Sequence, residues 1–271
     1  MVNNTLDKII KKKTERLVKL KKSLPLESLE EHMPDTITYI DFKETIEENI
    51  AKNKISIIAE IKKASPSAGI IVKDYNPIKI AEKYNDNKVT CLSVLTEEDF
   101  FLGDLRHLYK IKLQMNPMQP TNLHLPILCK DFFIDPYQIH LAKYYGADAI
   151  LIILSAVTEN MANQLYEEAL KLNMSVIVEV HTKDEAKYSL KFSDALIGIN
   201  NRNLKTLKTD INTTFDIHDI LIDHKGPLIS ESGIETRKEL LEITKKTKIK
   251  TFLIGESLLK SLNKNSIFSV L

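Results

Sequence analysis

Short apolar segments recur along the chain, and most of them are continuously apolar rather than alternating. Such runs are typical of strands that are covered on both faces, as in parallel sheets. Segments with apolar residues at helical spacing lie between them, as at residues 77–84, 161–172 and 240–243. This repeated alternation predicts an α/β fold of the (β/α)8 barrel, or TIM barrel, type. The eight predicted strands are at residues 55–62, 89–96, 125–131, 148–154, 175–180, 194–200, 227–231 and 250–255.

An open doubly wound sheet is the alternative architecture for the same alternation. Such a sheet normally has a glycine-rich phosphate-binding turn after its first strand. Here the first predicted strand is followed by Ala-Ser-Pro-Ser-Ala-Gly at residues 64–69. The barrel is therefore favoured.

Residues 1–54 precede the first predicted strand and contain two segments of helical character. The second segment begins at Asp41, where Glu44 three positions later gives a start like a capping box. We predict that residues 1–54 form a helical extension packed on a catalytic barrel of residues 55–271, within one structural domain. The first segment has eight Lys or Arg residues between positions 8 and 22, which we expect in solvent, and an apolar stripe expected against the barrel: Leu6, Ile10, Leu17, Leu20 and Leu24.

Composition limits the classes of protein that this chain can belong to. With 271 residues and 43% hydrophobic content, it can form one large α/β domain or two small ones. The net charge of +1 gives no global field for nucleic acid or an anionic membrane. There is no apolar run of the roughly 18 residues that span a membrane, and residues 1–13 lack the apolar core of a signal peptide. We expect a soluble cytoplasmic protein.

The cysteines and histidines do not form a recognisable motif. Cys91 and Cys129 lie within apolar runs, where a free cysteine behaves as a small buried hydrophobe, so no disulfide framework is expected. We predict no metal site, because no histidine falls in a HExxH or paired Cys/His spacing. We interpret all seven as surface or packing residues: His32, His107, His124, His140, His181, His218 and His224.

The first predicted strand contains two charged side chains, Glu60 and Lys62, in an otherwise apolar segment. They point to the same face because side chains alternate along a strand. A carboxylate and an ammonium in an apolar place are costly unless they are paired or used in chemistry. Taken alone, the segment is equally consistent with a structural ion pair and with a functional site.

The ends of the other predicted strands favour function. The strands of a parallel barrel all run the same way, so their last residues meet at one mouth, where active sites are found. Two lysines and two glutamates at one apolar mouth are hard to explain by stability alone. The polar residues expected there are Glu60, Lys62, Lys130, Glu179, Asn200 and Arg202, and the segment at the end of the seventh strand adds Glu231 and Ser232.

The seventh and eighth predicted strands are each followed by a glycine, Gly233 and Gly255. We expect Ser-Gly-Ile at 232–234 and Gly-Glu-Ser at 255–257 each to begin a helix. Backbone N–H groups at helix starts bind phosphate, and barrels often place that site after strands seven and eight. The pattern predicts a small phosphorylated substrate.

The strand-end segments resemble those of the indole-3-glycerol phosphate synthase family. The resemblance covers essentially the whole chain, including the helical extension, and each segment follows a different strand in the expected order. Residues 114–124, which we interpret as a surface loop, look longer than usual. The segments are IAEIKKASPSAG at 58–69, LCKDF at 128–132 with DPYQI at 135–139, VEVH at 178–181, GINNRNLKT at 198–206, SESGI at 230–234 and LIGESLL at 253–259.

The resemblance implies a carboxy-lyase of tryptophan biosynthesis that works without a cofactor. It would convert 1-(2-carboxyphenylamino)-1-deoxyribulose 5-phosphate into indole-3-glycerol phosphate with loss of CO2 and water. Lys130 or Lys62 would be acids for ring closure, Lys62 and Glu60 would serve dehydration, and which lysine acts first stays open. The implied catalytic residues are Glu60, Lys62, Lys130, Glu179, Asn200 and Ser232, where Glu179 would stabilise a cationic intermediate and Asn200 and Ser232 would orient the substrate. The implied substrate-binding residues are Ser65, Arg202, Glu231, Gly233, Gly255 and Glu256.

Two other functions stay open at this point. One is another phosphosugar barrel enzyme, such as phosphoribosylanthranilate isomerase, although an isomerase with one acid/base pair would not require Lys130 beside the first-strand segment. The other is a noncatalytic nucleic-acid binder that works through the basic helix at residues 8–22. We expect a phosphorylated small molecule as partner, no nucleic acid and no membrane, with other tryptophan-pathway enzymes as candidate protein partners.

Overall fold

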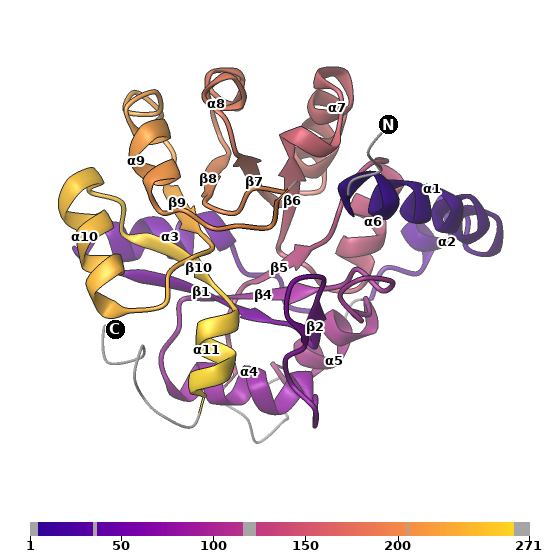
Figure 1. Cartoon of the computed structure of the whole chain (residues 1–271). Coiled ribbons are helices and arrows are strands. Elements are labelled where there is room, and N and C mark those ends of the chain that lie inside the picture. Colours follow the sequence, from indigo (N-terminus) through magenta and orange to yellow (C-terminus); the bar gives the residue numbers. More distant parts are fainter. Residues whose placement is uncertain (1–4, 35–36, 116–122, 205, 263–271) are drawn as a thin grey trace.

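Eight parallel strands close into a barrel, which confirms the predicted (β/α)8 fold (Figure 1). The computed structural model describes residues 5–34, 37–115, 123–204 and 206–262 of the chain. The neighbour order around the barrel is β1-β10-β9-β8-β7-β6-β5-β4, and β4 closes on β1. Every barrel strand falls inside a predicted segment: β1 (Ser56–Ile61), β4 (Cys91–Leu95), β5 (Ile127–Lys130), β6 (Ala149–Ile153), β7 (Ser175–Val180), β8 (Leu196–Asn200), β9 (Leu228–Glu231) and β10 (Thr251–Ile254).

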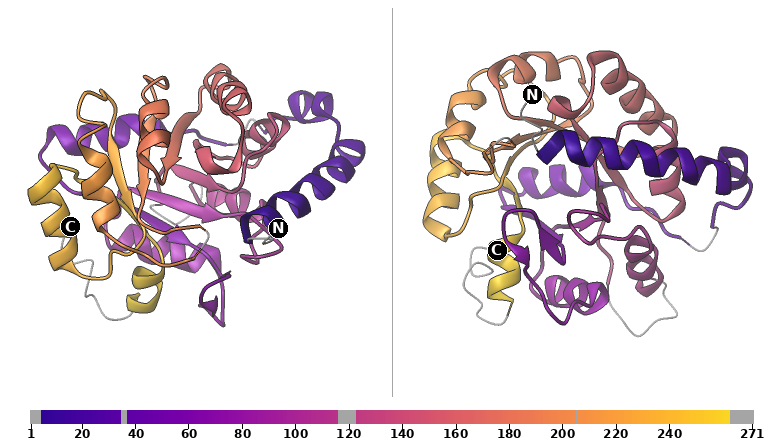
Figure 2. Two further views of the ribbon diagram at one scale, coloured as in Figure 1. Left: turned by 45° about the horizontal axis from the view of Figure 1, so that its top comes forward. Right: turned by 45° about the vertical axis from the view of Figure 1, so that its right-hand side comes forward.

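Helices follow the strands and form the outer layer of the barrel (Figures 1 and 2). Several begin where a side chain accepts a backbone N–H of the first turn, as Asn76, Thr158, Thr182 and Thr236 do. They are α4 (Pro77–Asp86), α5 (Arg106–Gln114), α6 (Tyr137–Tyr144), α7 (Glu159–Lys171), α8 (Lys183–Ser189), α9 (Asn212–His218), α10 (Arg237–Thr247) and α11 (Glu256–Ser261), with a 3-10 turn, η1 (Leu154–Ala156), before α7.

The described part of the segment before the barrel, residues 5–34 and 37–54, forms three helices, where the sequence predicted two. They are α1 (Thr5–Ser23), α2 (Leu26–Glu31) and α3 (Phe42–Ala51). Asp41 caps α3 by accepting the N–H of Glu44, as predicted. The sequence analysis missed α2, which has only 6 residues and is too short to show a helical period.

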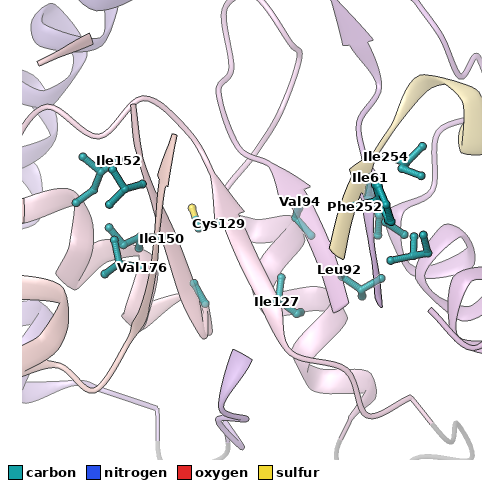
Figure 3. Packing of buried hydrophobic residues seen from close by; sticks show 14 of the residues in the cluster. Ile61, Leu92, Val94, Ile127, Cys129, Ile150, Ile152, Val176, Phe252 and Ile254 are labelled. Carbon is teal, nitrogen blue, oxygen red and sulfur yellow. The ribbon is translucent and has the colours of Figure 1, made fainter. Parts of the chain in front are cut away.

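The extension contacts both ends of the barrel. Phe42 and Ile46 of α3 pack into the cluster inside the barrel, and the N–H of Lys43 bonds to Ser175 at the start of β7. The helix α1 crosses the opposite mouth (Figure 2) and adds Ile9 to the same cluster. A second, larger cluster lies between the strands and the outer helices, and Figure 3 shows part of it.

One expectation about α1 is wrong, because not all of its lysines are in solvent. Lys13 is only 6% exposed and lies in the stripe that faces the barrel, between Ile9 and Leu17. Its ammonium is 2.7 Å from the carboxylate of Asp131, immediately after β5. The buried partner is far away in the sequence, so the local pattern could not predict this contact.

The remaining predictions concern the two cysteines, the loop at 114–124 and the lack of a membrane span. Cys91 and Cys129 are buried and free, as predicted. A small hairpin of β2 (Ala64–Ser65) and β3 (Gly69–Ile70) was not predicted. Of the expected loop at 114–124, residues 116–122 lie outside the described residues. Among the helices that the structure describes, none is both long and apolar enough to cross a membrane.

Candidate active site

A cavity of about 330 Å³ lies at the C-terminal ends of the strands, where the strand-end residues were expected to meet. Ten of the twelve predicted site residues line it: Glu60, Lys62, Lys130, Glu179, Asn200, Arg202, Ser232, Gly233, Gly255 and Glu256. The other two lie elsewhere. Ser65 lines an adjoining cavity of about 90 Å³, which also includes Lys62, Arg202 and Leu204. Glu231 is fully buried behind Lys130.

Glu60 and Lys62 form an ion pair across one face of β1, with 2.5 Å between Oε1 and Nζ. Burial alone would raise the pKa of Glu60, but the nearby cations, Lys62 foremost, hold it below its usual value. A Cβ on Gly255 would come within 2.2 Å of this Glu60 oxygen. Gly255 therefore leaves the space in which the pair sits.

Lys130 lies between two buried carboxylates. Its Nζ is 3.0 Å from Glu231 Oε2 and 3.6 Å from Glu179 Oε2. Burial alone would lower the pKa of Lys130, but these carboxylates raise it well above its usual value. Lys130 is therefore an ammonium at neutral pH.

The two carboxylates beside Lys130 respond differently to burial. The pKa of Glu179 lies well below its usual value, because Lys130 and His181 outweigh its desolvation. Burial and the repulsion of Glu179 raise the pKa of Glu231 to about 7, despite Lys130. A Cβ on Gly198 would come within 2.1 Å of Glu231 Oε1, so this carboxyl group sits against a glycine. The Lys130 ammonium therefore pairs with the ionised carboxylate of Glu179 and with the carboxyl group of Glu231, which readily holds a proton.

The loop after β8 contributes Asn200 and Arg202. The Asn200 side chain accepts the N–H of Arg202 at 2.9 Å and donates to Glu179. The guanidinium of Arg202 donates to the carbonyl of Leu207 at 3.0 Å. These bonds hold both side chains at the cavity wall.

The segments after β9 and β10 form the side of the cavity expected to bind phosphate. Gly255 is the N-cap of α11, as predicted. The prediction that 232–234 begins a helix is wrong, because α10 starts at Arg237 after the N-cap Thr236. Ser232 and Gly233 have φ values of 64° and 71°, which a right-handed helix does not use. The segment 232–234 is instead a loop at the cavity wall.

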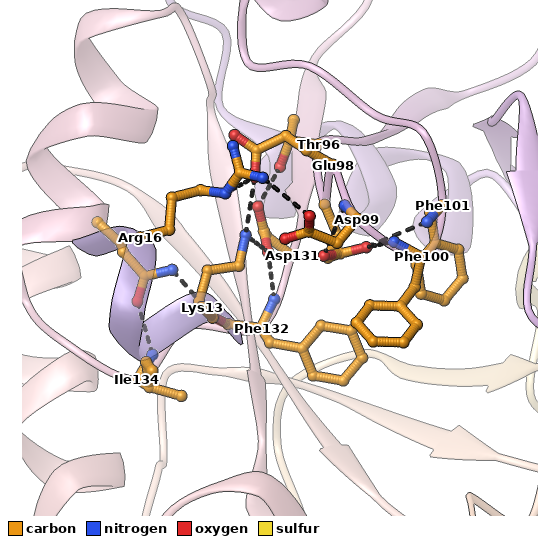
Figure 4. A network of polar contacts seen from close by, with 12 residues as sticks. Lys13, Arg16, Thr96, Glu98, Asp99, Phe100, Phe101, Asp131, Phe132 and Ile134 are labelled. Atoms are coloured by element: carbon orange, nitrogen blue, oxygen red, sulfur yellow. Dashed lines mark hydrogen bonds and ion pairs between the residues drawn. The ribbon is translucent and has the colours of Figure 1, made fainter. Parts of the chain in front are cut away.

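The opposite side of the cavity is apolar. Phe101 and Phe132 lie there with ring centroids 6.4 Å apart, and Leu204 lies in the same wall. The buried carboxylate of Glu97 holds the loop of Phe101 by accepting the backbone N–H groups of residues 99–101 (Figure 4). The sequence analysis did not identify these residues, because aromatic residues after a strand resemble ordinary core.

The contact of His181 with Glu179 was not predicted, because His181 was interpreted as a surface or packing residue. Its Nε2 is 3.2 Å from Glu179 Oε1. The signal was present in the sequence, since residues two positions apart on a strand share a face. His181 is not among the described residues that line the cavity.

Comparison with known proteins gives the family. The sequence model of indole-3-glycerol phosphate synthase matches residues 6–270. The chain belongs to this family. A synthase of this name from Alkaliphilus metalliredigens is 40% identical over 256 residues, which are 94% of this chain and 93% of that protein. The enzyme of this name from Legionella pneumophila strain Lens is 40% identical over 262 residues, 97% of this chain and 96% of its own.

Less similar proteins agree with this assignment. The synthase from Burkholderia lata is 36% identical over 260 residues, covering 96% of this chain and 95% of that one. A solved structure from Aquifex aeolicus VF5, titled only as a structural study, has a TM-score of 0.58 and 12% identity, and the match covers 83% of this chain and 92% of that one. This last likeness supports the fold alone. Membership in the synthase family favours a synthase over the isomerase alternative.

Proposed function

We propose that the protein converts 1-(2-carboxyphenylamino)-1-deoxyribulose 5-phosphate into indole-3-glycerol phosphate, CO2 and water. The main support is the cavity itself, which places Lys130 and Lys62, each paired with a buried carboxylate, between an apolar wall and a glycine-containing wall. The substrate carries an aryl ring, then the reacting carbonyl and then a phosphate. This order matches the apolar wall, the two lysines and the glycine-containing wall of the cavity. The aryl ring would lie against Phe101, Phe132 and Leu204.

The phosphate would lie at the other end of the cavity. Gly233, Gly255 and Glu256 line that end, and the two glycines have no side chain that would keep a phosphate from the backbone N–H groups. Arg202 and Ser232 would bind and orient the carboxylate of the substrate together with Asn200. Ser65 would contact the substrate from the β2–β3 hairpin, beside Lys62.

In the first step, the ring carbon that bears the carboxylate attacks the ketone carbon. We assign Lys130 as the acid that protonates the carbonyl oxygen, because it is an ammonium that lines the cavity. The ionised Glu179 would stabilise the cation that forms at nitrogen. Loss of CO2 then restores electrons to the ring. Glu231, 3.0 Å from Lys130 Nζ and able to hold a proton, would return one to Lys130.

In the last step, the hydroxyl formed from the ketone leaves as water. We assign Lys62 as the acid that protonates this leaving group and Glu60 as the base that accepts the ring proton. Their 2.5 Å contact keeps the two groups on one face of β1. Water loss completes the indole.

The direct test is turnover by the purified full-length protein. We expect product with indole fluorescence when the carboxyphenylamino substrate is added, with no added metal or nucleotide and with activity retained in EDTA. Phosphoribosylanthranilate serves as the comparison substrate for the isomerase alternative. Turnover of that compound alone, or turnover that required a divalent ion, would contradict the proposal.

We also propose that the protein is cytoplasmic, with other tryptophan-pathway enzymes as candidate protein partners. Its near-neutral charge gives no attraction to nucleic acid or to an anionic membrane. We also propose that residues 1–54 and the barrel act as one domain, which is supported by the packing of α1 and α3 against the strands.

A further inference from the structure

We propose that His181 is a positioning residue that holds the Glu179 carboxylate in its working orientation between Lys130 and the substrate. The inference rests on the proposed function, in which Glu179 stabilises a cation at the substrate nitrogen. His181 lies behind Glu179 and is not among the described residues that line the cavity. It therefore acts through Glu179 rather than on the substrate.

The geometry shows how Glu179 is held from two sides. Its Oε1 is 3.2 Å from Nε2 of His181, and its Oε2 is 3.6 Å from Nζ of Lys130. Each oxygen therefore faces a different cationic group. Without His181, the carboxylate would be left with the Asn200 amide and with Lys130, which also pairs with Glu231 at 3.0 Å.

A second carboxylate fixes His181 itself. Glu185 lies in the first turn of α8, and its Oε2 is 3.6 Å from Nδ1 of His181. The same oxygen accepts the backbone N–H of His181 at 2.6 Å. Glu185 thus holds the main chain at His181 and places a second carboxylate beside the ring.

The surrounding charges favour the imidazolium form. Glu179 on β7 and Glu185 on α8 face its two nitrogens, while Lys130 and Glu231 lie beyond Glu179. Burial alone would lower the pKa of His181, but the two carboxylates raise it to about 9. The positive charge is therefore present at neutral pH and is lost as the pH rises through about 9.

The test is the pH profile of kcat and KM for His181→Gln in the full-length protein. At pH 7.5 we expect kcat to fall by about tenfold or more with a small change in KM, because Glu179 is displaced but the cavity wall is intact. The wild-type protein should lose activity in a step near pH 9, and this step should be absent from the variant. An unchanged kcat, or the same step in the variant, would overturn the proposal.

Two further variants separate positioning from general damage. Glu185→Gln retains an acceptor for the backbone N–H and removes one charge beside His181. It should move the alkaline step to lower pH while kcat at pH 7 stays close to normal, and an unmoved step would contradict the proposal. The matched control is His140→Gln, which removes a similarly buried histidine 2.8 Å from Glu168 on the outer surface. It should leave kcat and the pH profile unchanged.

A readout that does not need activity keeps this inference separate from the proposed function. Titration of the imidazole NMR signals should show His181 protonated well above the usual pKa of about 6.5. Glu179→Gln should lower that pKa. A wild-type protein without turnover but with this titration would contradict the proposed function only. A His181 that titrates near 6.5, or that does not respond to Glu179→Gln, would overturn the inference.

Discussion

Lys130, Glu179 and Glu231 show how three buried charges can be used for proton transfer. One ammonium stands between two carboxylates, so Glu179 stays ionised and the pKa of Glu231 rises to about 7. Removing one member of such a set leaves an uncompensated buried charge, which is more costly than the set itself. Substitutions of these three residues should therefore change the free energy of unfolding and kcat in different ways.

For Lys130→Met we expect kcat to fall by about 10²-fold or more, the usual loss for a general acid. Without the ammonium, the two carboxyl groups should bind a proton in the folded state, which raises their pKa above the unfolded values. Stability is then present at low pH and is lost as the pH rises through the raised pKa. Denaturant titrations at pH 5 and 8 should show a larger loss for the variant than for the wild type.

The control for that prediction is the double variant Lys130→Met with Glu231→Gln. The second change imitates the protonated carboxyl, so it should remove most of the pH-dependent loss of stability without restoring kcat. A kcat near normal in either variant would show that the acid is assigned wrongly.

Lys62→Met should stop the reaction at a later point than Lys130→Met. If Lys62 serves dehydration, ring closure and decarboxylation should still occur, and a non-fluorescent indoline-like intermediate should accumulate in a single turnover. Rapid-quench analysis of both variants measures this. The same intermediate in both would contradict the separation of roles.

At the scale of elements, α1 is fastened across the mouth by buried and surface ion pairs (Figure 4). Lys13 contacts Asp131 at 2.7 Å, and Arg16 contacts Asp99 at 3.0 Å. Burial alone would lower the pKa of Lys13, but Asp131 foremost raises it. These partners belong to the segments that carry Phe101 and Phe132, so α1 is linked to the apolar wall of the cavity.

We therefore predict that Lys13→Met raises KM more than it lowers kcat. The change keeps the apolar stem but leaves Asp131 without its cation, and the free energy of unfolding should fall by at most about 3 kcal/mol, because Asp131 keeps its hydrogen bonds to Thr96 and the N–H of Phe132. Steady-state kinetics and denaturant unfolding measure the two effects. Lys12→Met is the matched control at an exposed position of α1. Equal KM values for Lys13→Met and Lys12→Met would show that the Lys13–Asp131 ion pair has only a structural role.

At the scale of the whole molecule, the extension and the barrel share buried polar contacts as well as apolar ones. Lys112 on α5 and Asp148 before β6 form a fully buried ion pair with 2.6 Å between Nζ and Oδ2. The same two side chains bind the carbonyl of Thr38 and the N–H of Ile40. The segment that leads into α3 is thereby fixed to the barrel, while α1 covers the opposite mouth. The closed barrel brings Glu60, on the first barrel strand, beside Gly255, directly after the last one.

The strands, the fold class and most of the cavity residues could be predicted from the amino-acid sequence. A strand buried on both faces must be apolar along its length, and parallel strands must end at one mouth, so Glu60, Lys130 and Glu179 could be placed together from local pattern alone. The side chain of Asp41 caps its own helix, which is also a local interaction. The family resemblance then supplied the chemistry.

Which of these charged side chains contact one another depends on the packing of distant segments and could not be predicted. The register between strands and the crossing of α1 put Lys13 beside Asp131 and Glu231 behind Lys130. The burial and pKa of Lys13 depend on Asp131, which is distant in the sequence, so the local pattern predicted Lys13 in solvent. Short elements such as α2 and the β2–β3 hairpin have too few residues to show a period, so their sequences alone do not predict them.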